Sequence, residues 1–196
     1  MPNILRHLSY FYRSTIVLIC SFLLVLAMGA TTGSAQEWRK LDTSKRKVQF
    51  SAPGLEGWTP GISVKVADSF AGRSEWVCWR KFKSKEANAC VTYQVTGGNG
   101  FAYKRATDIA SWSSAFKKVD YTVSSKIQEF ESSIGEIGTA RVSVEAGHMK
   151  NCFTFSRYLR GDYAFIRGWY CAAAETALPE DVIEQIISTI SIKESP

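Results

Sequence analysis

The stretch from Cys152 to Cys171 reads CFTFSRYLRGDYAFIRGWYC, and it decides the fold. Apolar and polar residues alternate on both sides of Gly161-Asp162, which is the pattern of two half-buried strands joined by a tight turn. Glycine in the first of two loop positions suits a type II′ hairpin turn. In that register Cys152 lies directly opposite Cys171, so we expect a disulfide across the hairpin. Counting outward from Arg160 and Tyr163 places the cysteine pair at a hydrogen-bonded site of the ladder.

The same alternation divides the hairpin into two faces. The better core face is apolar and consists of Phe153, Phe155, Leu159, Ile166 and Tyr170. The other face mixes aromatic, basic and hydroxyl side chains: Thr154, Ser156, Tyr158, Arg160, Tyr163, Phe165, Arg167 and Trp169. Aromatic and cationic side chains together can stack on sugar rings or bases and attract phosphate or carboxylate. We therefore predict a binding surface at Tyr158, Arg160, Tyr163, Arg167 and Trp169. In the alternative, helices or a neighbouring strand cover this face.

A second pair of cysteines flanks a second hairpin, predicted from strands over 76–83 and 88–95. Cys78 and Cys90 lie on its two arms, and we favour a Cys78–Cys90 disulfide, although no simple turn aligns the two as neatly. The chain has five cysteines, of which Cys20 lies within the first 35 residues, and the even number that follows is typical of a disulfide framework in the oxidising compartment of an exported chain. The wide spacing disfavours thiol exchange at a Cys-x-x-Cys pair and argues against a structural zinc site.

The first 35 residues have the three-part organisation of an export signal. Arg6 and Arg13 precede an apolar run over 15–30, and Gly33-Ser34-Ala35 supplies small residues for cleavage. The apolar run is shorter than the roughly 20 residues that span a bilayer, so cleavage is favoured over an uncleaved membrane anchor, which is the alternative. We expect a signal peptide at 1–35, a polar lead-in at 36–47 and a single domain at 48–196.

The remaining patterns predict an α+β domain: a mainly antiparallel sheet with two helices packed on it and two disulfides. Thr107 is expected to cap a helix over 107–118, in which Ile109, Trp112 and Phe116 share a core face. A second helix begins near 178–181 and carries an apolar stripe. Further strands are expected at 48–50, 62–66, 121–127, 128–132, 139–145 and 190–192.

Residues for catalysis are scarce. His148 is the only histidine outside the signal, and it falls in a predicted loop between strands, where a solvated histidine is usual. The acidic pairs Glu180/Asp181 and Glu129/Glu131 have no pattern that separates a glycosidase from a solvated surface. The tripeptide Arg160-Gly161-Asp162 matches an adhesion motif, but turn chemistry explains its glycine and aspartate. We predict no catalytic residue, no metal site and no cofactor.

The architecture resembles the Mog1/PsbP-like α+β sandwiches. The resemblance rests on a strand leading to Gly57-Trp58, an amphipathic helix around 109–116, paired long strands, and a terminal helix and strand over 182–192. Such domains are largely accessory or binding proteins, and no residue role is carried over from them. Trp76-Val77-Cys78 and Cys90 are faintly similar to the invasion-associated locus B family, but the spacing from tryptophan to cysteine departs from that family.

The full chain carries a net charge of +6, of which Arg6 and Arg13 of the predicted signal supply two, and the mild positive charge that remains equally suits a soluble exported domain. The sequence therefore favours an exported, noncatalytic binding or accessory domain of the bacterial periplasm or cell exterior. An anionic glycan, a lipid headgroup or another envelope protein are the partners we consider, and nucleic acid is disfavoured. The alternative is a small exported hydrolase that uses His148 or an acidic pair. An N-terminally anchored domain in the same compartment is the alternative location.

Overall fold

The computed structural model describes residues 39–40, 42–66, 73–79, 85–95, 105–145, 150–159 and 164–193, without the side chains of 39, 43, 62–66, 73 and 118. The chain divides into two compact units, Met1–Ala35 and Gln36–Pro196. All of the described residues belong to the second unit. The predicted signal peptide therefore lies outside them, as do His148, Arg160 and Tyr163.

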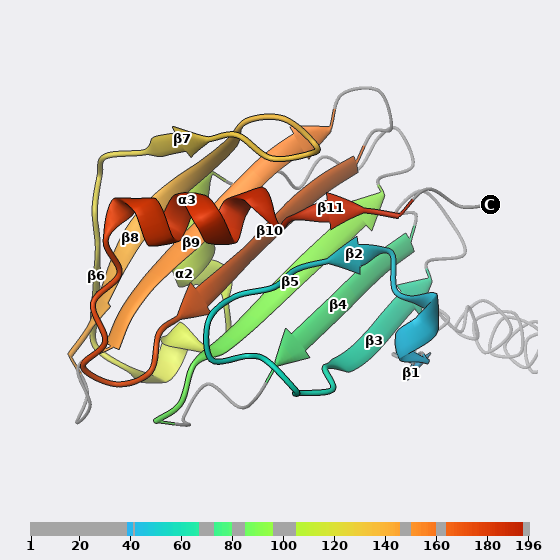
Figure 1. Cartoon of the computed structure of the whole chain (residues 1–196), viewed down its shortest axis with the longest axis horizontal. Helices are drawn as coiled ribbons and strands as arrows, with labels where there is room; N and C mark the ends of the chain where they lie inside the picture. The colour runs from blue at the N-terminus through green and yellow to red at the C-terminus, as the bar shows by residue number, and fades with distance from the viewer. Residues whose placement is uncertain are drawn as a thin grey trace, which may run out of the picture. The chain divides into compact units, whose positions relative to one another are not determined.

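Within these ranges nine strands form one sheet, and every pairing in it is antiparallel (Figure 1). Across the sheet the order is β1 (Arg39–Lys40), β3 (Gly61–Val66), β4 (Arg73–Trp79), β5 (Asn88–Val95), β10 (Ala164–Cys171), β9 (Lys150–Leu159), β8 (Ile137–Val144) and β6 (Tyr121–Val123). Strand β7 (Gln128–Phe130) also pairs with β8. A separate two-stranded sheet joins β2 (Val48–Gln49) to β11 (Ser191–Ile192).

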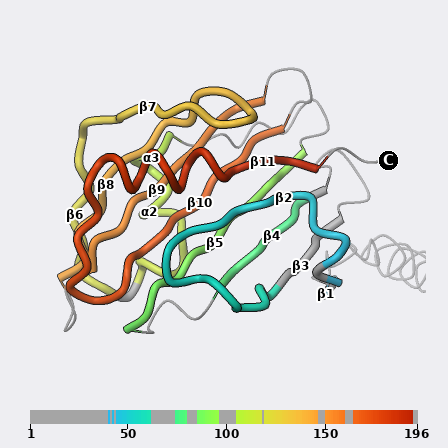
Figure 2. Tube along the Cα trace, in the orientation of Figure 1, coloured from blue at the N-terminus to red at the C-terminus, as the bar shows by residue number. Residues whose placement is uncertain are grey.

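The helices lie on opposite faces of the large sheet. Helix α3 (Glu180–Ser188) runs across the front together with β2 and β11, and α2 (Ala106–Trp112) lies behind, as the trace in Figure 2 shows. We call these two sides the α3 face and the α2 face. The predicted α+β class, with a mainly antiparallel sheet, two helices and two disulfides, is confirmed.

The main core lies on the α3 face. Phe153, Phe155, Ile166 and Tyr170 point to this side, because alternate residues of β9 and β10 share a face, as predicted. Ile183, Ile186 and Ile187 form the buried stripe of α3 and belong to the same cluster. Pro179 precedes the first turn of the helix, in which Glu180 and Asp181 complement the helix dipole.

A smaller core lies on the α2 face. Phe116 begins a 3₁₀ helix (Phe116–Lys118) that follows α2, and it packs with Ala110, Val142, Val144 and Trp169. This second cluster covers β8, β9 and β10, because α2 contacts these three strands. The α2 face therefore has a covered half over β8 to β10, whereas on this face of β4 and β5 the described side chains other than the buried Asn88 are half-buried.

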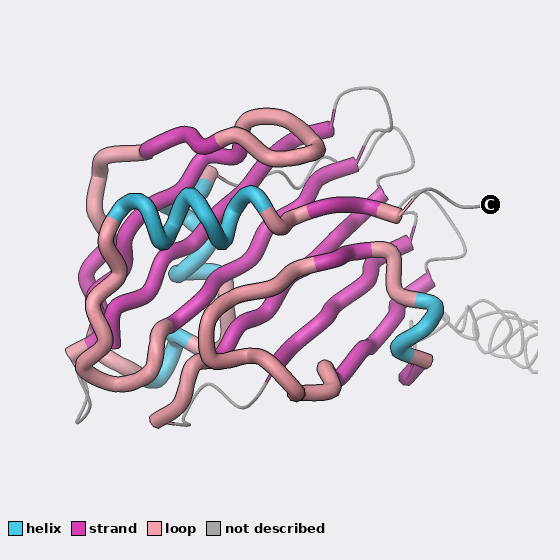
Figure 3. Tube along the Cα trace, in the orientation of Figure 1, coloured by secondary structure: helices cyan, strands magenta, loops and turns pink. Residues whose placement is uncertain are grey.

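The predicted helix over 107–118 is wrong in its length and its cap. Helix α2 ends at Trp112, and Ser113 has extended backbone angles (Figure 3). The Ser113 hydroxyl accepts a hydrogen bond from the backbone N–H of Ala115, the local competition that disfavours serine inside helices. Trp112 is 58% exposed rather than part of the core. The helix begins after Arg105, and no side chain, including that of Thr107, caps it.

Several strand boundaries also differ from those predicted. Strand β2 covers only Val48–Gln49 and pairs with β11 rather than joining the large sheet. The stretches predicted at 121–127 and 128–132 shorten to Tyr121–Val123 and Gln128–Phe130, and both pair with β8. Two separate short strands, β6 and β7, thus pair with the one long strand β8. Alternation alone could not predict that arrangement, because it depends on which strand each segment meets.

Candidate functional site

Both predicted disulfides are present and link residues that face each other across an antiparallel pair. Cys152 and Cys171 lie opposite in the β9–β10 ladder with a Cα–Cα distance of 4.0 Å, and Cys78 and Cys90 lie opposite in the β4–β5 ladder at 4.1 Å. These separations match the closer, non-hydrogen-bonded type of site. The predicted hydrogen-bonded site is wrong for Cys152–Cys171, because the adjacent Ala172 N–H donates to Asn151 O at 3.0 Å.

The two disulfides differ in solvent exposure, although both lie on the α2 face. Cys152 and Cys171 are 3% and 0% exposed, because Ala110 and Phe116 pack in the same cluster. Cys78 and Cys90 are half-buried on β4 and β5, outside the three strands that α2 contacts. One disulfide therefore lies in the covered half of this face and the other in the less covered half.

The predicted binding surface on the β9–β10 hairpin requires a correction. Trp169 is only 4% exposed, and its ring meets Phe116 edge-on with centroids 5.7 Å apart, so it belongs to the core. Thr154 is buried as well, and its hydroxyl donates to Ala106 O of α2 at 2.7 Å. Arg160 and Tyr163 are outside the described residues. Of the five predicted residues, only Tyr158 and Arg167 are described on this face and half-buried.

The arginines of the hairpin also do not form one surface. Arg157 points to the α3 face, where its Nη1 donates to the carbonyl oxygen of Glu136 and its guanidinium lies over Gly135. Arg167 points to the α2 face, because it is an even number of residues from Cys171 and Trp169. The alternation of side chains along β9 and β10 explains this separation.

Arg167 lies among polar side chains supplied by the neighbouring strand β5. Thr92 is directly opposite Arg167, and Gln94 is two residues further along the same face, opposite Phe165. All three polar side chains are half-buried. We call Arg167, Thr92 and Gln94 the Arg167 cluster. Sequence reasoning missed Thr92 and Gln94: their alternation with Ala89, Val91 and Tyr93 was readable, but the pairing of β5 with β10 was not.

The guanidinium of Arg167 is held in a desolvated position. Its Nη1 atom is buried and has no hydrogen-bond partner among the described residues. The guanidinium carbon lies 5.1 Å from the centroid of the Phe165 ring, within the range of a cation–π contact. Burial lowers the pKa of Arg167 from its usual value, since desolvation disfavours the charged form. The arrangement can therefore accept an anion that would pair with the uncompensated donor.

The carboxylates of the described strands lie away from this cation. Glu129 of β7 is on the α2 face by register, but it lies three strand spacings from Arg167, with Gly138 of β8 and Ser156 of β9 between them. That separation is roughly 14 Å at the usual strand spacing. Glu75 is fully buried on the opposite, α3 face of β4. The Arg167 cluster is thus a cationic and hydrogen-bonding site rather than an ion-pair network.

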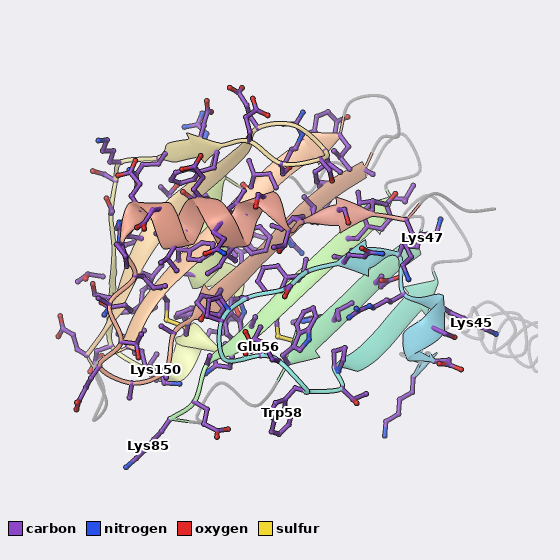
Figure 4. The ribbon with its side chains drawn as sticks, in the orientation of Figure 1. Lys45, Lys47, Glu56, Trp58, Lys85 and Lys150 are labelled. Carbon is purple, nitrogen blue, oxygen red and sulfur yellow. A yellow bond between two sulfur atoms is a disulfide. The ribbon has the colours of Figure 1, made fainter. Side chains whose placement is uncertain are left out.

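A second buried cation lies at the end of the sheet where β9 begins. The Lys150 side chain is buried and donates to Glu86 O at 3.4 Å, and burial lowers its pKa. Figure 4 shows Lys150 and Lys85 at the same end of the sheet, with Glu56 and Trp58 on the loop between β2 and β3. Sequence reasoning missed Lys150, because a lysine at the start of a strand is usually exposed.

The residues considered for catalysis are not brought together. His148 is outside the described residues. Glu129 and Glu131 are exposed at β7, and Glu180 and Asp181 are exposed in the first turn of α3. In the described ranges, no group of three or more His, Cys, Asp or Glu side chains could hold a metal ion. No helix in these ranges is long and apolar enough to cross a membrane.

Comparison with known proteins finds no matching protein-family model, curated protein or solved structure. The likeness to the Mog1/PsbP-like sandwiches therefore stays a resemblance of element order. The site has to be interpreted from its own chemistry.

Proposed function

We propose that the chain is an exported, noncatalytic binding or accessory domain that works in the bacterial periplasm or outside the cell. The observation that carries the proposal is the desolvated guanidinium of Arg167, which has an unpaired Nη1 atom beside two polar side chains. A buried donor without a partner costs free energy, so its retention is better explained by a ligand than by stability. The ligand that fits is anionic, such as a charged glycan.

The two disulfides support the compartment. Cross-links of this kind form and persist in oxidising surroundings, which are extracytoplasmic in bacteria. The predicted signal at 1–35 supplies the route, with cleavage after Ala35 as our proposal and retention as an N-terminal anchor as the alternative. Either form places the sheet in the same compartment.

The location is tested by expressing the full chain in a bacterium, fractionating the cells and sequencing the N-terminus of the product. We expect envelope or secreted material that begins at Gln36, with Cys78, Cys90, Cys152 and Cys171 all blocked to thiol reagents. A start at Met1 would reject cleavage. Cytosolic protein with free thiols would reject the exported role.

Binding is tested by screening the same product against arrays of neutral and acidic glycans and against vesicles of neutral and anionic lipids. We expect retention by acidic glycans that weakens as salt is raised, because salt screens charge attraction. Failure to retain any glycan or lipid would count against a binding role. A pocket that joined His148 to a serine and an acid would instead favour the exported hydrolase.

A further inference from the structure

We propose that the Arg167 cluster is a subsite for a single oxyanion, a carboxylate or a phosphate, carried by a sugar. The inference rests on the binding function proposed above and deepens it by assigning the residues and the ligand class. Arg167 supplies the charge, and Thr92 and Gln94 supply neutral hydrogen-bonding groups from the adjacent strand.

The sheet brings these three side chains to one place. Directly opposite residues of an antiparallel pair have Cβ atoms about 5 Å apart, and diagonal neighbours are about 7 Å apart. Arg167 and Thr92 are a directly opposite pair, and Gln94 is the diagonal neighbour on the same face. One oxyanion of a few ångströms can therefore contact all three, since arginine and glutamine side chains reach well beyond Cβ.

Among the described residues, part of the hydrogen-bonding capacity of the cluster is unused. Among the described residues, the side chains of Thr92 and Gln94 form no hydrogen bonds, and Arg167 Nη1 is buried and unpaired. A guanidinium donates two parallel N–H bonds to a carboxylate or phosphate, and such charge-assisted bonds are about twice as strong as neutral ones. The Phe165 ring, 5.1 Å from the guanidinium carbon, helps to hold the fork before a ligand arrives. A preorganised donor loses less conformational entropy on binding.

The charge around the cluster favours an anion. On the strands that form this face, the described carboxylate is Glu129, which lies three strands away in register and is exposed. Asp108 in the first turn of α2 is exposed as well. An incoming carboxylate or phosphate therefore meets the Arg167 charge without an adjacent competing acid among the residues that the structure describes.

The half-buried position of Arg167 favours a sugar over a membrane or a nucleic acid. Anionic bilayers attract clusters of protruding basic side chains, and nucleic acids engage several phosphates at once. Arg167 is half-buried within the sheet, and the next described cation on β9 and β10 that faces this side, Lys150, lies at the far end of β9, so a flat charged surface cannot engage Arg167 closely. Trp76 lies opposite Thr92 on β4 and is half-buried, so it adds aromatic surface on the same row. An aromatic side chain with a polar edge suits a ligand that is partly apolar and partly hydroxylated, such as a sugar ring.

The test measures binding to the product obtained by expressing the full chain, using isothermal titration with glucuronate, glucose 6-phosphate and neutral glucose. We expect both acidic sugars to bind and glucose to bind at least tenfold more weakly. Arg167→Gln should weaken acidic-sugar binding at least tenfold, and Arg167→Lys about fivefold, because lysine keeps the charge but loses the fork. Lys126→Gln removes one positive charge from an exposed position and should leave affinity unchanged.

Two further variants keep the test decisive if Arg167→Gln fails to fold, which intact-mass analysis of the disulfides and near-UV circular dichroism will reveal. Thr92→Val and Gln94→Leu keep the charge and remove one polar partner each, and each should weaken binding threefold or more. Unchanged acidic-sugar affinity in folded Arg167→Gln, or in both β5 variants, overturns the subsite. Equal binding of inorganic phosphate and glucose 6-phosphate would contradict the claim that a sugar carries the oxyanion.

The outcomes also separate this inference from the proposed function. If the glycan screen finds a ligand that binds wild type and Arg167→Gln equally, the binding role stands and the subsite falls. If anionic vesicles bind while acidic sugars do not, the ligand class is wrong. If neither the screen nor the titrations detect any ligand, both proposals fall together.

Discussion

Tyr170 illustrates how one side chain joins distant parts of the chain. Its hydroxyl donates to Pro53 O at 2.8 Å, which ties β10 to the loop after β2. Burial, with a smaller contribution from the charge on Glu56, raises the pKa of Tyr170 to about 12. The phenol is therefore neutral at physiological pH and can only act there as a hydrogen-bonding group.

This pKa predicts a loss of stability in base. Because folding raises the pKa of Tyr170 above its usual value of 10.0, its contribution to the free energy of unfolding is fully present below pH 10.0 and is lost as pH rises towards about 12. Tyr170→Phe should cost about 1 kcal/mol at neutral pH and flatten this decline. Urea unfolding of both proteins from pH 8 upward measures it. Parallel declines would show that Tyr170 does not titrate in this way.

Gly168 is required by close packing rather than by backbone angles. A Cβ at this position would collide with the carbonyl oxygen of Cys90 and lie 2.5 Å from the Phe155 ring. Both neighbours belong to paired strands, so moving either of them would cost free energy. Gly168→Ala should therefore lower the free energy of unfolding by about 2 kcal/mol or more. Gly61→Ala is the matched control, because its Cβ would meet only Cys78 O at 3.8 Å. Equal unfolding midpoints for the two variants would contradict this account.

At the residue scale, the sequence predicted which residues pair across strands better than it predicted which side chains are buried. The register that places Cys152 opposite Cys171 follows from counting around a turn and is correct. The burial of Trp169 does not follow from the hairpin, because the residues that cover it come from α2 and Phe116, far away in sequence. Alternation assigns a side chain to a face, and only the tertiary fold decides whether that face is open.

At the scale of elements, the two disulfide-bonded hairpins are similar in geometry and different in environment. Each bridge joins opposite residues of neighbouring antiparallel strands, with sequence separations of 12 and 19. The loop-entropy estimate gives each bridge about 3 kcal/mol, so entropy does not distinguish them. Solvent access does distinguish the two bridges, because α2 and Phe116 cover Cys152–Cys171 while Cys78 and Cys90 are half-buried.

We therefore predict that reduction of the folded protein is ordered. A limiting water-soluble reductant should open Cys78–Cys90 first, and the Cys152–Cys171 thiols should appear only with unfolding, because a reductant must reach sulfur to attack it. Differential alkylation with two mass labels, followed by peptide mapping, measures the order. The same protein in urea is the control, since both bridges should then open together. Simultaneous labelling of all four cysteines without urea would refute the order.

Short elements were the least predictable part of the fold. The pattern that extended a helix from Thr107 to Lys118 combined two pieces, α2 and a 3₁₀ helix, separated at Ser113. Ile109 and Phe116 are buried as the spacing suggested, while Trp112 at the end of α2 is exposed. By contrast, the apolar stripe of α3 was long and regular, and it is buried where the period predicts.

At the scale of the whole folded unit, a buried carboxylate holds the small sheet against the large one. Glu75 of β4 is fully buried, and its Oε1 accepts the backbone N–H of Lys47 at 2.8 Å and that of Val48 at 3.1 Å. Val48 pairs with Ile192, and Lys193 N–H donates to Lys47 O at 2.8 Å. One side chain thus fixes β2, and through it β11.

Replacing Glu75 should loosen this junction. Glu75→Leu leaves the two N–H groups without their acceptor and should cost about 1–3 kcal/mol, whereas Glu75→Gln keeps an acceptor oxygen and should cost less. Hydrogen exchange should accelerate at the amides of Lys47, Val48 and Lys193 before the core strands are affected. Glu129→Gln, at an exposed position, is the control. Unchanged exchange at these amides in Glu75→Leu would disprove the role.

The pairing of β2 with β11 also constrains the order in which the chain can fold. A polypeptide that leaves the ribosome or threads a translocation pore from its N-terminus presents Val48 long before Ile192, its partner. Phe50 and Leu55 share a core with α3, so they too can be buried only after α3 has been delivered. Chaperones can hold the nascent chain until then. The α3 face can therefore be completed only after Ile192 has been delivered, and until then the preceding segments stay incompletely packed and can be unfolded for transport.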